Sequence, residues 1–311
     1  MAEYISFQPS DYFNSVLYTG TGAVQTISGV GFEPDLTWCK DRTNSYDQVW
    51  FDQVRGATER LTSNTYTAES TQVNDLTAWN SDGFVVGSGS NINNNTNLFV
   101  GWNWKAGTTT GLSGGTMTPV AYSINTTSGF GIYQYVGTAA TATIAHGLGK
   151  VPKFVITKSM DAGNNWRCYH EAMGNTKLNQ LNENANIGTD ANAWNSTTPT
   201  DTLFTLGSSN DTNTSGVNYI AYMFCDVPGY SKLGEYWGNG QTSDGTFVYT
   251  GFRPSFILMK RTSGGTGNWQ VFDDKRLGYN GGNSYLAPND ANAENTGGQI
   301  DIVSNGFKMR N

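Results

Sequence analysis

The stretch "GFEPDLTWCK", residues 31–40, decides the fold, because the chain repeats it as "GKVPKFVITK" at 149–158 and as "GFRPSFILMK" at 251–260. In every copy Gly comes first, Pro fourth and Lys tenth, without a gap. Pro is tolerated at the start of a strand, where its missing N–H is not needed for the sheet. Because side chains alternate along a strand, Leu36 and Trp38 share one face. Each decapeptide therefore predicts a strand with one face turned to a core.

The similarity continues downstream of the decapeptides. The segment "VWFDQVRG" matches "WQVFDDKRLG" in the third copy, whereas the second copy has His170 in the place of the Asp. A repeat of roughly one hundred residues is domain-sized and much longer than a solenoid unit. The sequence thus predicts tandem domains that share a set of structural positions. These positions are Gly31, Pro34, Lys40, Asp52, Arg55, Gly149, Pro152, Lys158, Gly251, Pro254, Lys260, Asp273 and Arg276.

The three lysines that close the decapeptides have the same parity as the core residues. A charge at the end of a buried face must reach water or find a partner. We expect Asp52 or Asp273 to be that partner, and Glu171 in the second copy. Tryptophan also recurs in the three copies, at Trp50, Trp166 and Trp269, which we assign to one repeat position and to core packing.

The composition favours an all-β protein of antiparallel β-sandwich domains. Gly numbers 38 residues, aromatic residues reach 13 % and charged residues only 14 %, which suits strands joined by turns. We expect a first β-sandwich over 1–107, a linker over 108–129, a second β-sandwich over 130–230 and a third over 231–311. The Gly-rich stretch "GTTTGLSGG", residues 107–115, marks the start of the linker.

The third copy is predicted to be incomplete. The first two copies end in aromatic strands, "LFVGWNWKAG" from Leu98 and "NYIAYMFCDVPG" from Asn218, and the third has no counterpart. Either more chain follows, which we favour, or a neighbouring subunit adds the strand. An open sheet edge is an aggregation hazard, so we do not expect it to be left bare.

Charge and cysteine content narrow the class of protein. The net charge of −7, with scattered Lys and Arg, disfavours nucleic-acid binding. No segment has the length and apolarity of a membrane span or of a secretion signal, so we expect a soluble protein without membrane insertion. Cys39, Cys168 and Cys225 are odd in number and lie in apolar contexts. Buried free thiols formed in a reducing cytoplasm are the prediction.

The segments "GFEPDLTWCKDRTNSYDQVWFDQVRG", "LTSNTYTAES" and "FVGWNWKAG" resemble a repeat found in tandem in tail-fibre-like and virion structural proteins of tailed phages, particularly marine ones. The third copy resembles it equally, and the second keeps Gly149, Pro152, Lys158 and Trp166 but has lost the Asp and the Arg. The resemblance implies a lectin-like, jelly-roll-type β-sandwich and a place on the virion surface, with assembly in the host cytoplasm. It brings no catalytic or ligand residues.

No constellation of catalytic residues is evident, and we predict that the protein is not an enzyme. His146 and His170 lack Cys or His at metal spacing, and we interpret both as structural. Paired carboxylates for glycoside hydrolysis would have to come from Asp273 with Asp274, or from Glu69 with Asp75. We expect no cofactor, although the Asn- and Asp-rich loops "NIGTDANAWN" from Asn186 and "NDANAEN" from Asn289 are candidate Ca²⁺ loops.

Three hypotheses for the function follow. The first is a virion structural protein, a fibre or decoration subunit on tail or capsid. We expect it to be a homo-oligomer that contacts other virion proteins and contributes to host attachment. The second is a carbohydrate-binding adhesion module that contacts host surface glycans through exposed aromatic side chains, for which Trp79, Trp194 and Trp237 are the candidates. The third, a polysaccharide depolymerase, is the least favoured.

Overall fold

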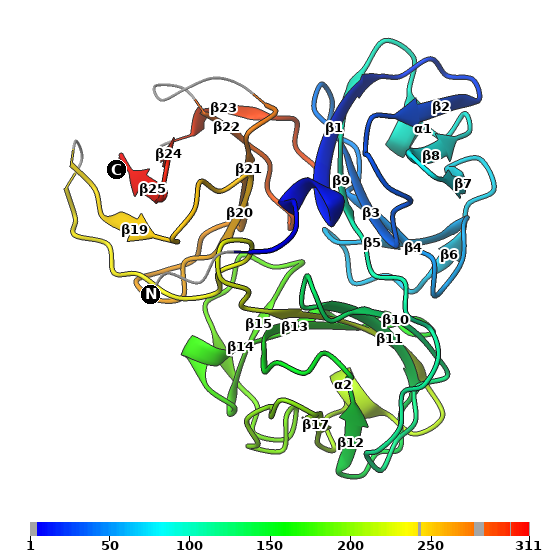
Figure 1. The fold of residues 1–311 in the computed structure, drawn as a ribbon, viewed down its shortest axis with the longest axis vertical. Helices are drawn as coiled ribbons and strands as arrows, with labels where there is room; N and C mark the ends of the chain where they lie inside the picture. The colour runs from blue at the N-terminus through cyan, green and yellow to red at the C-terminus, as the bar shows by residue number, and fades with distance from the viewer. Residues whose placement is uncertain (1–4, 242–243, 277–282, 299, 311) are drawn as a thin grey trace.

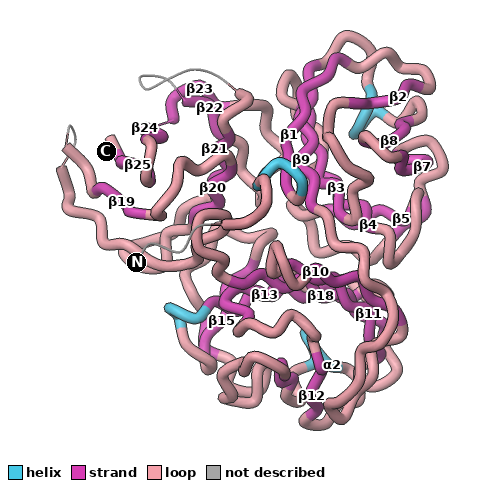
Figure 2. Tube along the Cα trace, in the orientation of Figure 1, coloured by secondary structure: helices cyan, strands magenta, loops and turns pink. Residues whose placement is uncertain are grey.

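The computed structural model describes residues 5–241, 244–276, 283–298 and 300–310. The described chain is mostly β, built from antiparallel sheets with a few short helical turns (Figures 1 and 2). The β class predicted from composition is therefore confirmed. Figure 1 shows three lobes around a common centre, and we call them module 1 (residues 5–107), module 2 (108–230) and module 3 (231–310).

Module 1 has a large sheet and a small one. The large sheet has the order β1 (Phe13–Thr19), β9 (Leu98–Trp104), β3 (Leu36–Asp41), β4 (Val49–Asp52), β5 (Glu59–Thr62) and β6 (Ser70–Thr71). The small sheet has the order β2 (Gln25–Ser28), β8 (Gly83–Val86) and β7 (Leu76–Asn80). The helical turns η1 (Pro9–Asp11) and α1 (Ser90–Asn93) lie outside the sheets.

Module 2 repeats this plan. Its large sheet has the order β10 (Ala121–Asn125), β11 (Phe130–Val136), β18 (Asn218–Cys225), β13 (Pro152–Ser159), β14 (Arg167–His170), β15 (Lys177–Gln180) and β16 (Gly188–Thr189). Its small sheet pairs β12 (Ala142–Ala145) with β17 (Leu203–Leu206), and the helical turns are η2 (Glu171–Met173) and α2 (Asn210–Asn213). Because β10 lies within 108–129, the stretch expected to be a linker is in part a strand of this sheet.

Module 3 contains a reduced version of the large sheet. Strand β20 (Phe256–Met259) pairs with β21 (Gln270–Asp273), and β22 (Asn283–Tyr285) pairs with β23 (Asn295–Gly298). The small sheet has the order β19 (Phe247–Tyr249), β25 (Gly306–Met309) and β24 (Ile300–Val303). In modules 1 and 2, the strand equivalent to β20 lies between two neighbours, whereas within the described residues β20 has β21 alone.

The three decapeptides begin in the same backbone conformation. Gly31, Gly149 and Gly251 have φ angles of 88°, 63° and 86°, in the left-handed region that a residue with a Cβ adopts only at a cost. The prolines that follow are buried in all three copies. Pro152 opens its strand as predicted, while the strands after Pro34 and Pro254 begin two residues later.

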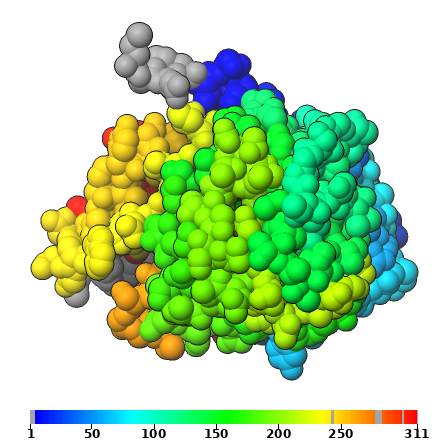
Figure 3. All heavy atoms as spheres, turned by 90° about the horizontal axis from the view of Figure 1, so that it is seen from below, coloured from blue at the N-terminus to red at the C-terminus, as the bar shows by residue number. Residues whose placement is uncertain are grey.

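The strand after each glycine is covered on both faces in the complete modules. In β3 every residue is buried. Cys39 points into a core between the two sheets of module 1, whereas Leu36 and Trp38 point the other way, into a cluster that also contains Ile156 of module 2 and Val271 of module 3. The modules thus share a central core, and the expectation of separate domains strung along a chain is wrong. Figure 3 shows module 2, in green, nearest the viewer, with module 3 in yellow and orange on one side and module 1 in blue and cyan on the other.

Candidate functional site

The closing lysines of the decapeptides join each module to the next. The Nζ atom of Lys40 donates to the carbonyl of Ala291 in module 3 at 2.9 Å. Lys158 of module 2 donates to the carbonyl of Tyr66 in module 1 at 3.3 Å. The corresponding donor in module 3 is Lys260, whose acceptor is a carbonyl of module 2, that of Asn184, at 3.3 Å. The contacts run from module 1 to 3, from 3 to 2 and from 2 to 1, so they close a ring.

The lysine partners are thus main-chain carbonyls, and the expected pairing with Asp52, Asp273 or Glu171 is wrong. Lys40 also donates to the carbonyl of Tyr46 at 2.9 Å, and Glu171 pairs with Lys153 instead. Burial lowers the pKa of Lys40 to about 8, against the opposing effect of nearby carboxylates.

A second ring of contacts lies beside the lysines. The indole Nε1 of Trp166 donates to the carbonyl of Thr62 at 2.9 Å, and that of Trp269 donates to the carbonyl of Gln180 at 2.8 Å. At the third junction the donor is the side-chain amide of Gln48, and the acceptor is the carbonyl of Ala287. All three acceptors lie four residues before the carbonyl that binds the lysine. The position is therefore repeated, but with Gln in one of its three copies.

Trp50 does not belong to that position. It faces Trp38 across the sheet, as Cys168 faces Ile156. The predicted equivalence of Trp50 with Trp166 and Trp269 is therefore wrong by two residues, although core packing is right, since Trp50 is 1 % exposed.

Two of the three junctions contain a buried ionic cluster. Asp52 pairs with Arg55 at 2.6 Å, and Arg55 with Glu69 at 2.9 Å. The hydroxyl of Tyr222, on strand β18 of module 2, donates to the same Asp52 carboxylate at 2.7 Å. The repeated positions Asp52 and Arg55 thus hold a strand of the neighbouring module.

The second cluster lies at the junction of modules 1 and 3. Asp273 pairs with Arg276 at 2.6 Å, and Arg276 with Glu294 at 3.1 Å. The indole of Trp102, on strand β9 of module 1, donates to Asp273 at 2.8 Å. Trp102 and Tyr222 have equivalent register positions, because Trp102 faces Trp38 and Tyr222 faces Ile156.

At the third junction, between modules 2 and 3, the described residues contain no such cluster. By register, His170 takes the place of the aspartate, since it faces Phe154 as Asp52 faces Leu36. The places of the arginine and the glutamate are taken by Met173 and Ile187. All three line a cavity of about 1500 Å³.

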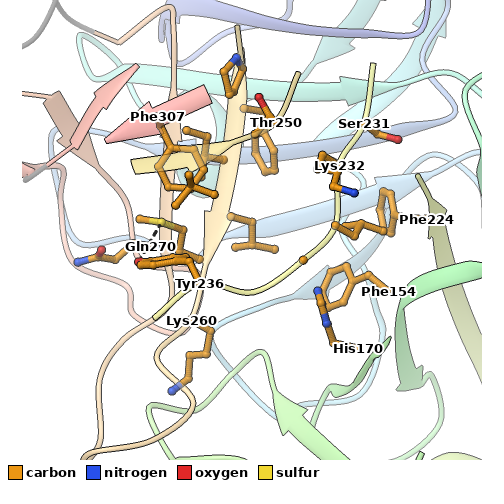
Figure 4. A pocket seen from close by; sticks show the side chains of 18 of the residues that line it. Phe154, His170, Phe224, Ser231, Lys232, Tyr236, Thr250, Lys260, Gln270 and Phe307 are labelled. Atoms are coloured by element: carbon orange, nitrogen blue, oxygen red, sulfur yellow. Dashed lines mark hydrogen bonds between the residues drawn. The ribbon is translucent and has the colours of Figure 1, made fainter. Parts of the chain in front are cut away.

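This cavity, which we call the strand cavity, lies beside β20 and reaches the central core. Its walls include Trp38, Trp104, Phe154, His170, Phe224 and Phe256. Figure 4 shows Phe154, Phe224 and His170 on one side, and Phe307, Tyr236 and Lys260 on the other. The ring centroids of Phe154 and His170 are 6.0 Å apart. An apolar hollow of this size, with a few polar groups, is what a binding site requires.

Four buried polar groups in its walls have no hydrogen-bond partner among the described residues. They are the indole N–H groups of Trp38 and Trp50 and the hydroxyls of Ser15 and Ser128, and these residues are 1 %, 1 %, 4 % and 2 % exposed. Buried polar groups in folded proteins are as a rule hydrogen-bonded, so each of these marks a place where a partner is expected.

The three candidate glycan-contact tryptophans differ in exposure. Trp194 is fully buried, and its indole donates to the carbonyl of Lys177, so its expected exposure is wrong. Trp79 is half-buried and donates to Thr37. Trp237 is 80 % exposed and lies at the mouth of the strand cavity.

The candidate catalytic carboxylates all lie in ion pairs. Asp273 and Glu69 belong to the ionic clusters above. Asp274 pairs with Arg253, and Asp75 pairs with Arg60. The structure does not bring together the two members of either pair proposed for hydrolysis as free, facing carboxylates.

The other chemical candidates also have structural partners. His146 is buried, its Nδ1 accepts the N–H of Leu148 at 3.2 Å, and burial lowers its pKa. In the part of the chain that the structure describes, no group of three or more His, Cys, Asp or Glu side chains is arranged to hold a metal ion. The candidate Ca²⁺ loop from Asn289 contributes to a junction, since Ala291 accepts from Lys40 and Glu294 pairs with Arg42.

The prediction of buried free thiols is confirmed. Cys39, Cys168 and Cys225 are free and buried, and burial raises the pKa of each thiol, to about 12 for Cys39 and Cys225. Through the same described residues, no helix has the length and apolarity needed to cross a membrane.

Sequence reasoning missed one repeated residue, a buried asparagine at the end of α1 and of α2. The side-chain amide of Asn93 donates to the carbonyls of Gly87 and Ala23, and that of Asn213 to those of Gly207 and Ala140. The matching "GSGSNIN" and "GSSNDTN" segments contained this signal.

Comparison with protein families places the chain in one of them. Residues 8–311 match the model of a family described as a domain of unknown function, DUF7483, and the chain belongs to that family. The match extends across all three modules, in agreement with their shared core. Searches of the curated proteins and of the solved structures found no match.

Proposed function

We propose that this protein is a structural component of a tailed-phage particle, a fibre or decoration subunit exposed on the tail or capsid, assembled in the host cytoplasm. Its role is non-enzymatic, and it contributes to host-surface attachment with other virion proteins as partners. We also interpret each module as a lectin-like β-sandwich of the jelly-roll type. In module 1 a core that includes Ile27, Cys39 and Phe84 lies between the two sheets.

The observation that carries the proposal is the closed ring of three equivalent modules in one chain. The lysine contacts from Lys40, Lys158 and Lys260 repeat at every junction. Such a body presents a repeated module three times, which suits repeated weak contacts with a surface. The resemblance to tandem repeats of virion structural proteins supports the same role.

The test is to locate the chain in the particle. An antibody raised against the recombinant protein, applied to intact virions of the encoding phage, should label the tail or the capsid surface. Mass spectrometry of the same virions after density-gradient purification should recover the chain at a fixed ratio to the major capsid protein. If the chain is missing from purified particles but abundant in the lysate, the proposal fails.

A carbohydrate-binding role is the second candidate, and one observation favours it. The exposed indole of Trp237 lies beside the strand cavity, and Tyr249, another cavity residue, is 66 % exposed. Aromatic faces of this kind stack on sugar rings. A glycan array that uses the wild type and Trp237→Ala should show binding lost in the variant, with the matched variant Tyr66→Ala as control. No binding by the wild type removes this candidate.

A further inference from the structure

The two complete modules show what belongs in the strand cavity of the third. In module 1, β9 lies between β1 and β3, and in module 2, β18 lies between β11 and β13. Both inserted strands are antiparallel to the decapeptide strand beside them. Strand β20 of module 3 occupies the decapeptide position, and its edge away from β21 is unpaired among the described residues. A row of unpaired backbone groups is a template for another strand.

The other border of the position is also recognisable. Leu233 precedes Gly251 by eighteen residues, as Phe13 precedes Gly31, and both side chains pack against the central core. Phe13 begins β1, which pairs with β9. The segment from Leu233 to Asn239 is the counterpart of β1, but it is not a strand. A strand is stabilised by hydrogen bonds to a neighbouring strand. The neighbour of β1 is β9, and among the described residues this segment has no equivalent of β9.

The register defines the side chains that the cavity accepts. Opposite Leu36 and Phe154 are Trp104 and Phe224, and therefore an aromatic residue is expected opposite Phe256. Two residues earlier in the inserted strand, Trp102 and Tyr222 occupy the position that lies opposite Leu258 in module 3. The residue before that is small, Gly101 in β9 and Ala221 in β18. A Cβ added at Gly101 would lie 3.2 Å from the ring of Phe84, so the small residue fits against the module's own core.

His170 determines whether the residue opposite Leu258 must donate or accept a hydrogen bond. Its Nδ1 accepts the N–H of Ala172 at 3.1 Å, so the neutral ring carries its proton on Nε2 and presents a donor. The carboxylates of Asp52 and Asp273 accept at the equivalent positions. The residue opposite Leu258 must therefore offer an acceptor to His170. A tyrosine hydroxyl both donates and accepts, whereas a tryptophan N–H can only donate.

We propose that the strand cavity binds a β-strand donated by a partner polypeptide, antiparallel to β20, with the pattern aromatic, aliphatic, Gly or Ala, Tyr, any residue, aromatic. The strand pairs with β20 on one side and orders the segment from Leu233 to Asn239 on the other. Its tyrosine accepts a hydrogen bond from His170, and its last aromatic ring packs on Phe256. A second copy of the chain is a poor donor, because the matching strands β9 and β18 are central in their own sheets.

Four residues of the cavity lining, Ser15, Trp38, Trp50 and Ser128, have a buried polar side-chain atom without a hydrogen-bond partner among the described residues. A strand of seven residues spans about 23 Å, which is the length of β9. The strand-binding proposal does not depend on where the protein acts. It can fail while the virion role holds, and the virion role can fail while strand binding holds.

The test uses the 311-residue chain and a synthetic peptide of residues 216–226, the β18 sequence, with Cys225→Ser. Calorimetric titration should give one bound peptide per chain, with the negative heat-capacity change of apolar burial. Amide hydrogen exchange of Phe256–Met259 should slow on binding. A scrambled peptide of the same composition is the control and should do neither.

Two matched variants test the contact with His170. The peptide with Tyr222→Phe should bind about three- to tenfold more weakly, the cost of one hydrogen bond. Against the protein variant His170→Phe, the two peptides should bind equally. Equal binding of the Tyr and Phe peptides to the wild type refutes the His170 contact. Failure to slow exchange in β20, or equal binding of the scrambled peptide, overturns the proposal. Sedimentation that shows a dimer whose formation protects β20 would assign the cavity to a second copy and also overturn it.

Discussion

The hydroxyl of Tyr222 offers a sharp test of the contacts between modules, because the substitution Tyr222→Phe removes one atom. The side chains of Tyr222 and Asp52 are fully buried, and the hydroxyl donates to the carboxylate across the junction at 2.7 Å. Asp52 keeps its contacts with Arg55 in the variant. The loss is therefore that of one hydrogen bond to a charged group, about 1.5–3 kcal/mol of unfolding free energy.

The matched control is Tyr135→Phe. Tyr135 is equally buried, and its hydroxyl donates at 2.7 Å to the neutral carbonyl of Thr212 within module 2. We expect a loss of about 0.5–1.5 kcal/mol there. Urea unfolding followed by tryptophan fluorescence measures both variants, and the slope with denaturant should be unchanged. If Tyr222→Phe costs no more than Tyr135→Phe, the ionic cluster does not hold the strand of the neighbouring module.

Three further predictions follow from the junctions and turns. Lys40→Met leaves the carbonyls of Tyr46 and Ala291 without their donor and should cost about 1–3 kcal/mol in urea unfolding; a neutral result would contradict the ring of lysine contacts. Gly149→Ala puts a Cβ at a φ of 63° with open space around it. The free energy of unfolding should therefore fall by about 1–2 kcal/mol, measured as a lower melting temperature. An unchanged melting temperature would show that the left-handed φ is not required. Burial lowers the pKa values of His146 and His170 in the folded state, so below pH 6.5 the unfolded state binds more protons than the folded state. The free energy of unfolding should therefore drop as the pH falls, and more steeply than in the double variant with Asn at both positions. If the free energy of unfolding depends on pH equally in the two proteins, the prediction is refuted.

The sequence alone was sufficient for the repeated strand. Gly, Pro and Lys at fixed spacing in the decapeptides correctly indicated three strands, because the left-handed φ of Gly31 and the burial of Pro34 depend on residue type. The expectation of one buried face was too low for β3, in which every residue is buried. The absence of a counterpart to β9 and β18 in the third copy was also visible. Both features are local, and local constraints on the backbone can be recognised from the residue types in the sequence.

The arrangement of the modules could not be predicted in the same way. The lysines bind main-chain carbonyls, such as that of Ala291, and any residue type supplies a carbonyl. Trp50 was misplaced because it was matched to Trp166 by residue type. Gln48 and Trp166 each follow their closing lysine by eight residues, and the match by type concealed this equivalence. One feature of the sequence indicated the shared core. The residues "LTWC" place apolar side chains on both faces of their strand, and a single two-sheet domain explains the burial of only one face.

The central claim is that the three modules form one body around a shared core, closed by contacts at every junction. Differential scanning calorimetry of the 311-residue chain tests it most directly. We predict one transition whose calorimetric and van't Hoff enthalpies agree, as a single cooperative unit requires, and which moves as a whole in Tyr222→Phe. Two or three separate transitions, with Tyr222→Phe shifting one of them alone, would contradict the account.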